Sequence, residues 1–111
     1  MRRVRLNEKR QTKICYRFFA NLANPPRLAA IEKLIDKPMS VTELAVALEQ
    51  EQSMVSHNIK PLLQCKIITA HREGKRHILI VNQETVAPIL NTVENHALKF
   101  CPKGGKCLQE E

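Results

Sequence analysis

Five polar side chains between residues 52 and 60 have the types and the spacing that suit recognition of DNA. In a helix, Val55, Ile59 and Leu62 would share the inward face, because apolar residues three or four positions apart line one side. The outward face would then carry Gln52, Ser53, Ser56, His57 and Lys60. Amide, hydroxyl and imidazole groups can bond to base edges or phosphates, and lysine pairs with phosphate. We therefore predict a face that contacts double-stranded DNA; the alternative is a polar helix face that meets only solvent.

A second basic group lies in the segment REGKR, residues 72–76. β-Branched runs at 67–71 and 77–81 flank it, and Glu73-Gly74 can form the tight turn of a β-hairpin. The basic side chains of this predicted hairpin are Arg72, Lys75 and Arg76. Their charge suits the DNA backbone or minor groove beside a helix in the major groove.

A short helix is predicted directly before the polar one. Ser40-Val-Thr-Glu43 matches a capping box, in which the serine oxygen accepts a first-turn N–H and the glutamate accepts the serine N–H. Residues 49–52 contain no glycine, so ordinary residues must form the turn between the two helices. Residues 40–81 are therefore predicted to form a helix-turn-helix followed by a wing.

Three further helices are predicted around this unit. Thr12 can cap the first, Asn24-Pro25 can begin the second, and Thr85 can cap a last helix that extends to Phe100. The second helix would bury Leu28, Ile31, Leu34 and Ile35. The predicted fold class is mainly α with a small β-hairpin: a winged helix-turn-helix of about five helices and a two-stranded wing. The predicted organisation is a basic flexible arm at 1–11, one domain at 12–100 and a flexible cysteine-containing tail at 101–111.

The charge of the chain points to a polyanionic partner. Eighteen Lys and Arg residues stand against 11 Asp and Glu, which gives a net charge of +7 in 111 residues. No apolar run approaches the length of a membrane span, and the basic start is not a signal peptide. The expected location is the cytoplasm. No set of nucleophile, base and orienting residue and no phosphate-binding loop is present, so the chain is not expected to be an enzyme.

Four cysteines add a second kind of chemistry. Cys65 lies at the end of the polar helix, and packing is the preferred interpretation for it and for Cys15 taken alone. Cys101-Pro-Lys-Gly-Gly-Lys-Cys107 is flexible enough to bring its two sulfurs together. These thiols could bind arsenite or a soft metal ion such as zinc, or form a disulfide switch, or belong to an inert tail.

Four segments follow a common family pattern: LANPPRLAAIEKL, SVTELAVAL, QSMVSHNIKPL and REGKRHILI. Taken together, they resemble the ArsR/SmtB family of winged helix-turn-helix repressors. The resemblance covers about residues 12–100 and implies a homodimer that pairs through its first and last helices. Residues 15–22 and 86–100 would then be dimer surface. Cys15 could lie near Cys101 across that surface and supply a third sulfur, so Cys15, Cys101 and Cys107 are the candidate metal or redox residues.

The sequence departs from the family pattern at several positions. The usual Ser or Thr cap before the recognition helix is Glu51, and the usual Arg-His pair is His57-Asn58. Lys66 stands where the family often has a glycine that closes this helix. The cysteine pair that several members carry in the third helix is absent from ELAVAL. A sensing site must therefore lie elsewhere.

The predicted function is a sequence-specific transcriptional repressor that binds an inverted-repeat operator as a homodimer. A thiol-reactive effector (arsenite, a soft metal or an oxidant) would release it through the end-helix cysteines. Two alternatives stay open. One is a constitutive DNA-binding regulator without an effector, and the other is a winged helix that binds proteins.

Overall fold

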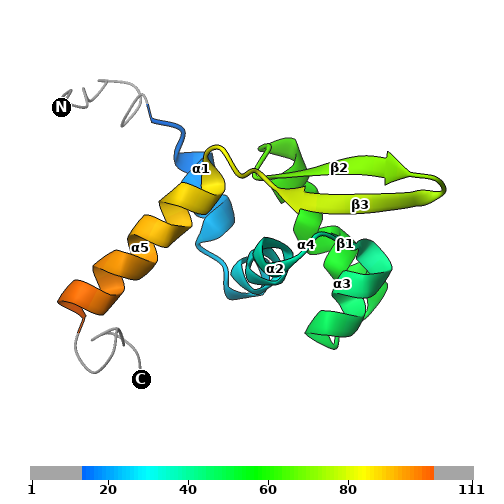
Figure 1. The fold of residues 1–111 in the computed structure, drawn as a ribbon, viewed down its shortest axis with the longest axis horizontal. Helices are drawn as coiled ribbons and strands as arrows, with labels where there is room; N and C mark the ends of the chain where they lie inside the picture. Colours follow the sequence, from blue (N-terminus) through cyan, green and yellow to red (C-terminus); the bar gives the residue numbers. More distant parts are fainter. Residues whose placement is uncertain (1–13, 102–111) are drawn as a thin grey trace.

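A computed structural model describes residues 14–101 as five helices and a three-stranded antiparallel sheet (Figure 1). The elements are α1 (Tyr16–Leu22), α2 (Pro25–Asp36), β1 (Met39–Ser40), α3 (Val41–Leu48), α4 (Gln52–Gln64), β2 (Ile68–Glu73), β3 (Arg76–Val81) and α5 (Val86–Phe100). The predicted winged helix-turn-helix class is confirmed. Within residues 14–101, no helix is long and apolar enough to cross a membrane.

The first two helices begin at different kinds of residue. The helix predicted from Thr12 begins only at Tyr16, with Cys15 as its N-cap and no side-chain capping bond, so that boundary was wrong; Thr12 lies outside the described residues. Asn24 caps α2 as predicted, because its Oδ1 accepts the N–H of Arg27 at 3.1 Å. Of the four residues predicted to form the inward face of α2, Ile35 is wrong, since it is 39% exposed.

Local caps and turns determine where the helices of the helix-turn-helix begin and end. Ser40 Oγ accepts the N–H of Glu43 at 3.2 Å, and Glu43 Oε1 accepts the N–H of Ser40 at 2.9 Å, which confirms the capping box. Glu49 ends α3 at a φ of +54°. Lys66 follows α4 at a φ of +61°. Both residues take the left-handed conformation that a glycine would adopt more easily.

The sheet has one strand more than predicted. Two residues, Met39 and Ser40, form β1 and pair with Leu79 and Ile78 of β3, so the strand order is β1-β3-β2. The turn of the wing was predicted one residue too early. Glu73 pairs with Arg76, and the two residues between them form the turn, with Gly74 at a φ of +62°.

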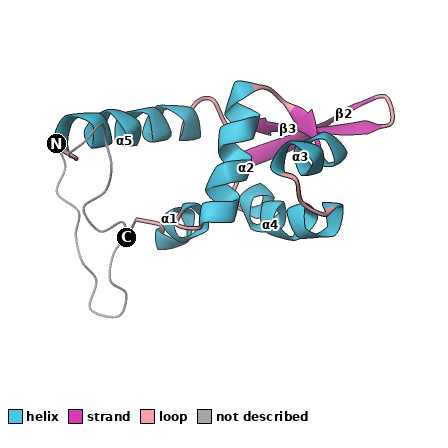
Figure 2. Ribbon diagram, turned by 90° about the horizontal axis from the view of Figure 1, so that it is seen from below, coloured by secondary structure: helices cyan, strands magenta, loops and turns pink. Residues whose placement is uncertain are grey.

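One apolar core joins α2, α3, α4 and the sheet. Its largest fully buried side chains in the described part of the chain are Ile31, Leu34, Leu44, Val55, Leu62, Ile67, Ile68, Leu79, Val81 and Val86. Helix α5 projects away from this body on the side opposite the tip of the wing (Figures 1 and 2). Only Val86, at its start, is buried, while Leu90 packs partly against the core.

The start of α5 is fixed by a residue other than the one predicted. Thr85 occupies the N-cap position but makes no side-chain capping bond. Asn82 instead accepts the N–H groups of Glu84 and Thr85 at its Oδ1, at 3.1 and 3.3 Å. Its backbone oxygen accepts from Val86 and Ala87, and its Nδ2 donates to Lys66 O at 3.2 Å. Asn82 thereby ties the root of α5 to the end of α4.

Candidate DNA-binding interface

Helix α4 presents the predicted polar face to solvent. Val55, Ile59 and Leu62 are buried in the core and anchor the opposite face. The exposed side chains are Gln52, Ser53, Ser56, His57 and Lys60. The structure therefore brings together the whole predicted set on one accessible helix, and its contact with DNA stays a prediction.

The N-terminus of α4 has the weak cap that its sequence predicts. Glu51 is the N-cap residue, but its side chain makes no capping hydrogen bond. Its backbone oxygen accepts the N–H of Val55 at 3.1 Å and starts the helical ladder. First-turn N–H groups are thus left to solvent or to a phosphate. The helix continues through Pro61 to Gln64, because proline removes only one bond of this ladder.

The wing places its three predicted basic residues in three different environments. Arg72 folds back on the turn, where its Nε donates to Gly74 O at 3.0 Å. Lys75 is exposed within the turn itself. Arg76 begins β3 and forms an ion pair with Glu43 of α3 through its Nη2. The three residues therefore lie at one end of the hairpin but do not form a single uniform patch.

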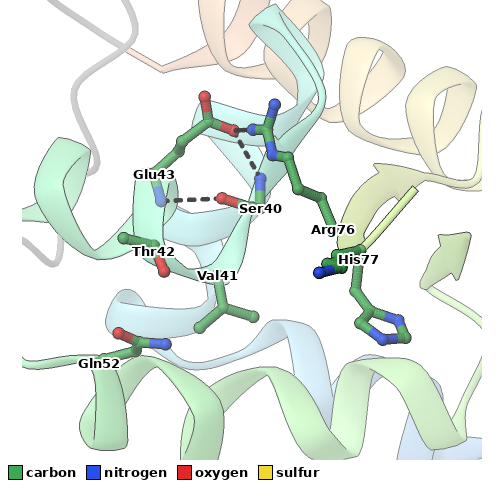
Figure 3. Close-up of a pocket in the computed structure, with 8 residues that line it drawn as sticks. Ser40, Val41, Thr42, Glu43, Gln52, Arg76 and His77 are labelled. Atoms are coloured by element: carbon green, nitrogen blue, oxygen red, sulfur yellow. Dashed lines mark hydrogen bonds and ion pairs between the residues drawn. The ribbon is translucent and has the colours of Figure 1, made fainter. Parts of the chain in front are cut away.

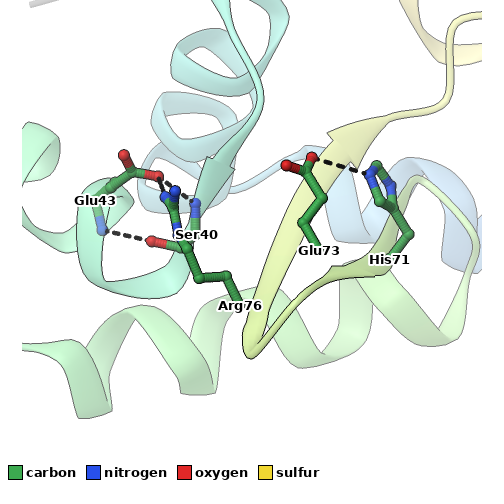
Figure 4. A network of polar contacts seen from close by, with 5 residues as sticks. All are labelled: Ser40, Glu43, His71, Glu73 and Arg76. Atoms are coloured by element: carbon green, nitrogen blue, oxygen red, sulfur yellow. Dashed lines mark hydrogen bonds and ion pairs between the residues drawn. The ribbon is translucent and has the colours of Figure 1, made fainter.

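Glu43 connects the wing to the helix-turn-helix. Its Oε1 accepts from both the Ser40 N–H and Arg76 Nη2 (Figure 4). The backbone N–H of Ser40 is the main cause that lowers the pKa of Glu43 below 4.5, and the charge of Arg76 lowers it further. The carboxylate therefore stays ionised and remains a partner for Arg76 at neutral pH.

A hollow of about 550 Å³ lies between the start of α3, the first residue of α4 and the wing (Figure 3). It is lined by Ser40, Val41, Thr42, Glu43, Gln52, Lys75, Arg76 and His77. Gln52, Lys75 and Arg76 are all predicted DNA contacts. The hollow therefore brings one residue of the recognition helix together with two of the wing, although they lie far apart in the sequence.

Two residues on this side of the molecule were not singled out by the sequence pattern. Met54 is 53% exposed on α4, beside the polar set, and the helical spacing could have placed it there. Glu43 was predicted only as part of a capping box. Its contact with Arg76, 33 residues further along the chain, has no local sequence signal.

The predicted dimer surface is apolar and uncovered in a single chain. Phe19 on α1 is 53% exposed, and Val93 and Phe100 on α5 are 58% and 69% exposed. Phe18 and Leu22 turn instead toward the core of the same chain. The stripe at 15–22 is thus divided between the core and the surface, while most of α5 faces outward.

The candidate sulfur ligands are only partly described. Cys15 is exposed at the start of α1, and Cys101 is half-buried at the end of α5; both are free thiols. Cys107 lies outside the described residues. Over residues 14–101, no three His, Cys, Asp or Glu side chains are grouped so that they could hold a metal ion. The predicted three-sulfur site therefore stays a prediction, and no chemistry is derived from it.

The fold and the exposed polar face of α4 define a winged helix-turn-helix protein. The profile of the family HVO_A0114 matches residues 22–87, more than half of the chain, and the protein belongs to that family. The resemblance to ArsR/SmtB regulators is also confirmed by the relatives that follow.

Two relatives match by sequence. The HTH-type transcriptional regulator NmtR of Mycobacterium tuberculosis is 33% identical over 76 residues, which are 68% of this chain and 63% of the relative. A transcriptional repressor SmtB homolog of Synechocystis is 28% identical over 79 residues, 71% of this chain and 60% of the relative. The chain thus spans less than two thirds of the length of either relative.

A solved structure has the same fold. It is the homodimeric winged helix-turn-helix DNA-binding domain of a possible ArsR-family transcriptional regulator from Mycobacterium bovis. It superposes with a TM-score of 0.72 at 27% identity, and the match covers 78% of this chain and 80% of that domain.

Proposed function

We propose that this protein is a sequence-specific DNA-binding transcriptional regulator, and a repressor, that binds an inverted repeat as a homodimer. The observation that carries the proposal is the exposed polar face of α4 beside a basic wing. This face would enter the major groove, where Gln52 and His57 can bond to base edges and Lys60 to a phosphate. Lys75 and Arg76 would follow the flanking backbone or minor groove.

The homodimer is supported by the uncovered apolar side chains of α1 and α5. A lone helix that exposes Val93 and Phe100 leaves apolar surface in water, and a second copy would cover it. The similar domain from Mycobacterium bovis is described as homodimeric. Two copies of α4 related by a twofold axis would reach half-sites about one or more helical turns of DNA apart.

A thiol-reactive effector is the proposed means of release, acting in the cytoplasm on Cys15, Cys101 and Cys107. Cys15 and Cys101 lie at the ends of the two helices that would form the dimer. Arsenite, a zinc-like soft metal or an oxidant that joined these thiols would favour one dimer geometry over another. The relatives named NmtR and SmtB homolog are regulators of transcription, which supports a regulator in place of an enzyme.

A second candidate function, a protein-interaction module, is favoured by one observation. Val46 on α3 and Met54 on α4 are 74% and 53% exposed, so the helix-turn-helix side is not purely polar. Apolar side chains can also contact thymine methyl groups, and both functions therefore accommodate Met54.

A mobility-shift assay on random duplex DNA separates the two functions. A DNA-binding regulator retards the duplex, and the affinity falls steeply as salt rises, because phosphate contacts release counterions. A protein-interaction module retards the duplex only through its net positive charge, at low salt and without selecting any sequence from the pool.

The effector is tested on the same complex with arsenite, zinc or peroxide added. Release of DNA by one of them, abolished when Cys101 and Cys107 are both replaced by Ser, is the expected result. Unchanged release in that variant would exclude these two thiols as the site where the effector acts. If none of the three additions released the DNA, the constitutive regulator would be favoured.

A further inference from the structure

The contact between Glu43 and Arg76 joins two parts of the molecule that are expected to meet DNA separately. Glu43 lies in the first turn of α3, directly before the recognition helix, and Arg76 is the first residue of the second wing strand. Figure 4 shows the two side chains meeting across the space between these elements. The contact between His71 Nε2 and Glu73 Oε2, at 3.6 Å, stays within the hairpin.

We propose that Glu43 is a positioning residue that holds the Arg76 guanidinium ready for a DNA phosphate. The proposal rests on the DNA-binding function proposed above and assigns Glu43 a role beyond its cap on α3. Glu43 would not touch DNA itself, and its effect would pass through Arg76.

The geometry of the pair leaves Arg76 able to bind a second acceptor. A guanidinium carries five N–H donors in a planar fork, and the contact with Glu43 uses Nη2. The remaining donors can reach a phosphate without breaking this contact. The Glu43 oxygen also accepts the N–H of Ser40, so its position is set by the backbone of the N-cap residue of α3.

The surroundings of Arg76 place it beside two other predicted DNA contacts. The hollow that Arg76 lines also includes Gln52, the first residue of α4, and Lys75 (Figure 3). The pairing of Ser40 with Ile78 fixes β3 against the start of α3 on the same side. Arg76 is thus anchored at its backbone by the sheet and at its head group by Glu43.

Because Glu43 already holds Arg76, the Arg76 side chain would lose less conformational entropy when the protein binds DNA. A free arginine loses rotamer entropy when it contacts a phosphate, whereas an arginine held by a carboxylate has lost part of it already. A purely electrostatic role gives the opposite sign. Removal of a negative charge from a surface that meets a polyanion should strengthen binding.

The test is a double-mutant cycle on the full-length chain, measured by fluorescence anisotropy with a duplex of random sequence over a series of salt concentrations. The variants are Glu43→Gln, Arg76→Ala and their combination. Glutamine keeps the capping box, because its side-chain oxygen can still accept the Ser40 N–H. Glu73→Gln is the matched control. It also removes one negative charge near Arg76, but the Glu73 side chain contacts His71 and not Arg76.

We expect Glu43→Gln to weaken binding by roughly 2- to 10-fold, the effect of ordering one flexible side chain. The slope of log affinity against log salt should fall by up to about one, the value for one phosphate contact. In the Arg76→Ala background the same substitution should strengthen binding, because Glu43 then only repels phosphate. Glu73→Gln should not weaken binding.

Other results of the same cycle would contradict the positioning role of Glu43. Stronger binding by Glu43→Gln in both backgrounds, or an equal loss in both, would overturn the positioning role. If Glu43→Gln loses the circular-dichroism spectrum of the folded chain, Arg76→Lys is measured in its place, because lysine keeps the charge but lacks the planar fork. Unchanged affinity and salt slope in Arg76→Lys would then overturn the proposal. A wild-type chain that binds no duplex would instead contradict the DNA-binding function itself.

Discussion

The wing and helix α5 are attached to the same core in opposite ways. The wing is held on two sides within one chain, by the pairing of β1 with β3 and by the Glu43–Arg76 ion pair. Helix α5 is held mainly at its root, through Val86, and exposes Val93, Leu98 and Phe100 along its length. The position of the wing relative to α4 is thus set inside the protomer. Helix α5 has no such second attachment within the described chain, and a second copy is the partner that we propose for its exposed face.

The largest expected effect comes from a charge on the uncovered face of α5. Val93→Asp combined with Phe100→Asp should weaken self-association by at least ~100-fold, because each copy would have to bury unpaired carboxylates. Sedimentation velocity measures the change. Val46→Asp, at an even more exposed apolar position on α3, is the control and should leave association unchanged. A dimer that persists in the α5 variant would show that this face is not the interface.

Removal of two charges from the wing should have the next largest effect. Lys75→Ala combined with Arg76→Ala is expected to weaken binding of all duplex sequences at least ~10-fold, since two charge-assisted contacts are lost. The salt slope should become flatter by about two. Lys33→Ala, on the exposed face of α2, removes one charge away from the hollow and serves as the control. Unchanged affinity in the wing variant would exclude the wing from the DNA interface.

The elements of the fold differ in how far the sequence predicts them. Ser40 with Glu43, and Asn24 with Pro25, are local signals, and the helices they begin were predicted at the right residues. Strand β1 has only two residues and no alternation, so its pairing with β3 follows from the tertiary fold alone. Asn82 determines the start of α5 through contacts on both sides of it, whereas the sequence pattern indicated Thr85 as the cap.

In the candidate site, too, the local features follow from the sequence and the tertiary contacts do not. The polar residues of α4 follow from helical spacing, because Val55, Ile59 and Leu62 define the buried face. The hollow that combines Gln52 with Lys75 and Arg76 depends on where the wing folds back. The left-handed Glu49 and Lys66 had no glycine to mark them, although the sequence required a turn at the first position.

A smaller effect is expected at the cap of α3. Ser40→Ala removes the oxygen that accepts the Glu43 N–H and should lower the free energy of unfolding by about 1 kcal/mol. Urea unfolding followed by circular dichroism measures this change. Thr85→Ala is the contrasting control, because Thr85 makes no side-chain capping bond, and its cost should be clearly smaller. Equal costs at the two positions would contradict the cap assignments.

The smallest effect is a pH dependence of stability that comes from Glu43. The Ser40 N–H and then Arg76 lower its pKa in the folded chain below 4.5, so the ionised group stabilises the fold above that value. This contribution should be lost as the pH falls through the lowered folded pKa. The difference in unfolding free energy between wild type and Glu43→Gln should be constant near neutral pH and shrink in acid. A difference that grows in acid would contradict the assignment.

The claim that helix α4 reads DNA is tested most directly by selection of bound DNA from a random pool with the full-length chain. We expect enrichment of an inverted repeat whose two half-sites are separated by one or more helical turns, bound with a steep salt dependence. Substitution of Gln52 or His57 should change the selected bases, while Lys75→Ala should weaken binding without changing them. A pool with no enriched sequence, or one whose selected bases are indifferent to α4, would contradict the claim that this helix reads DNA.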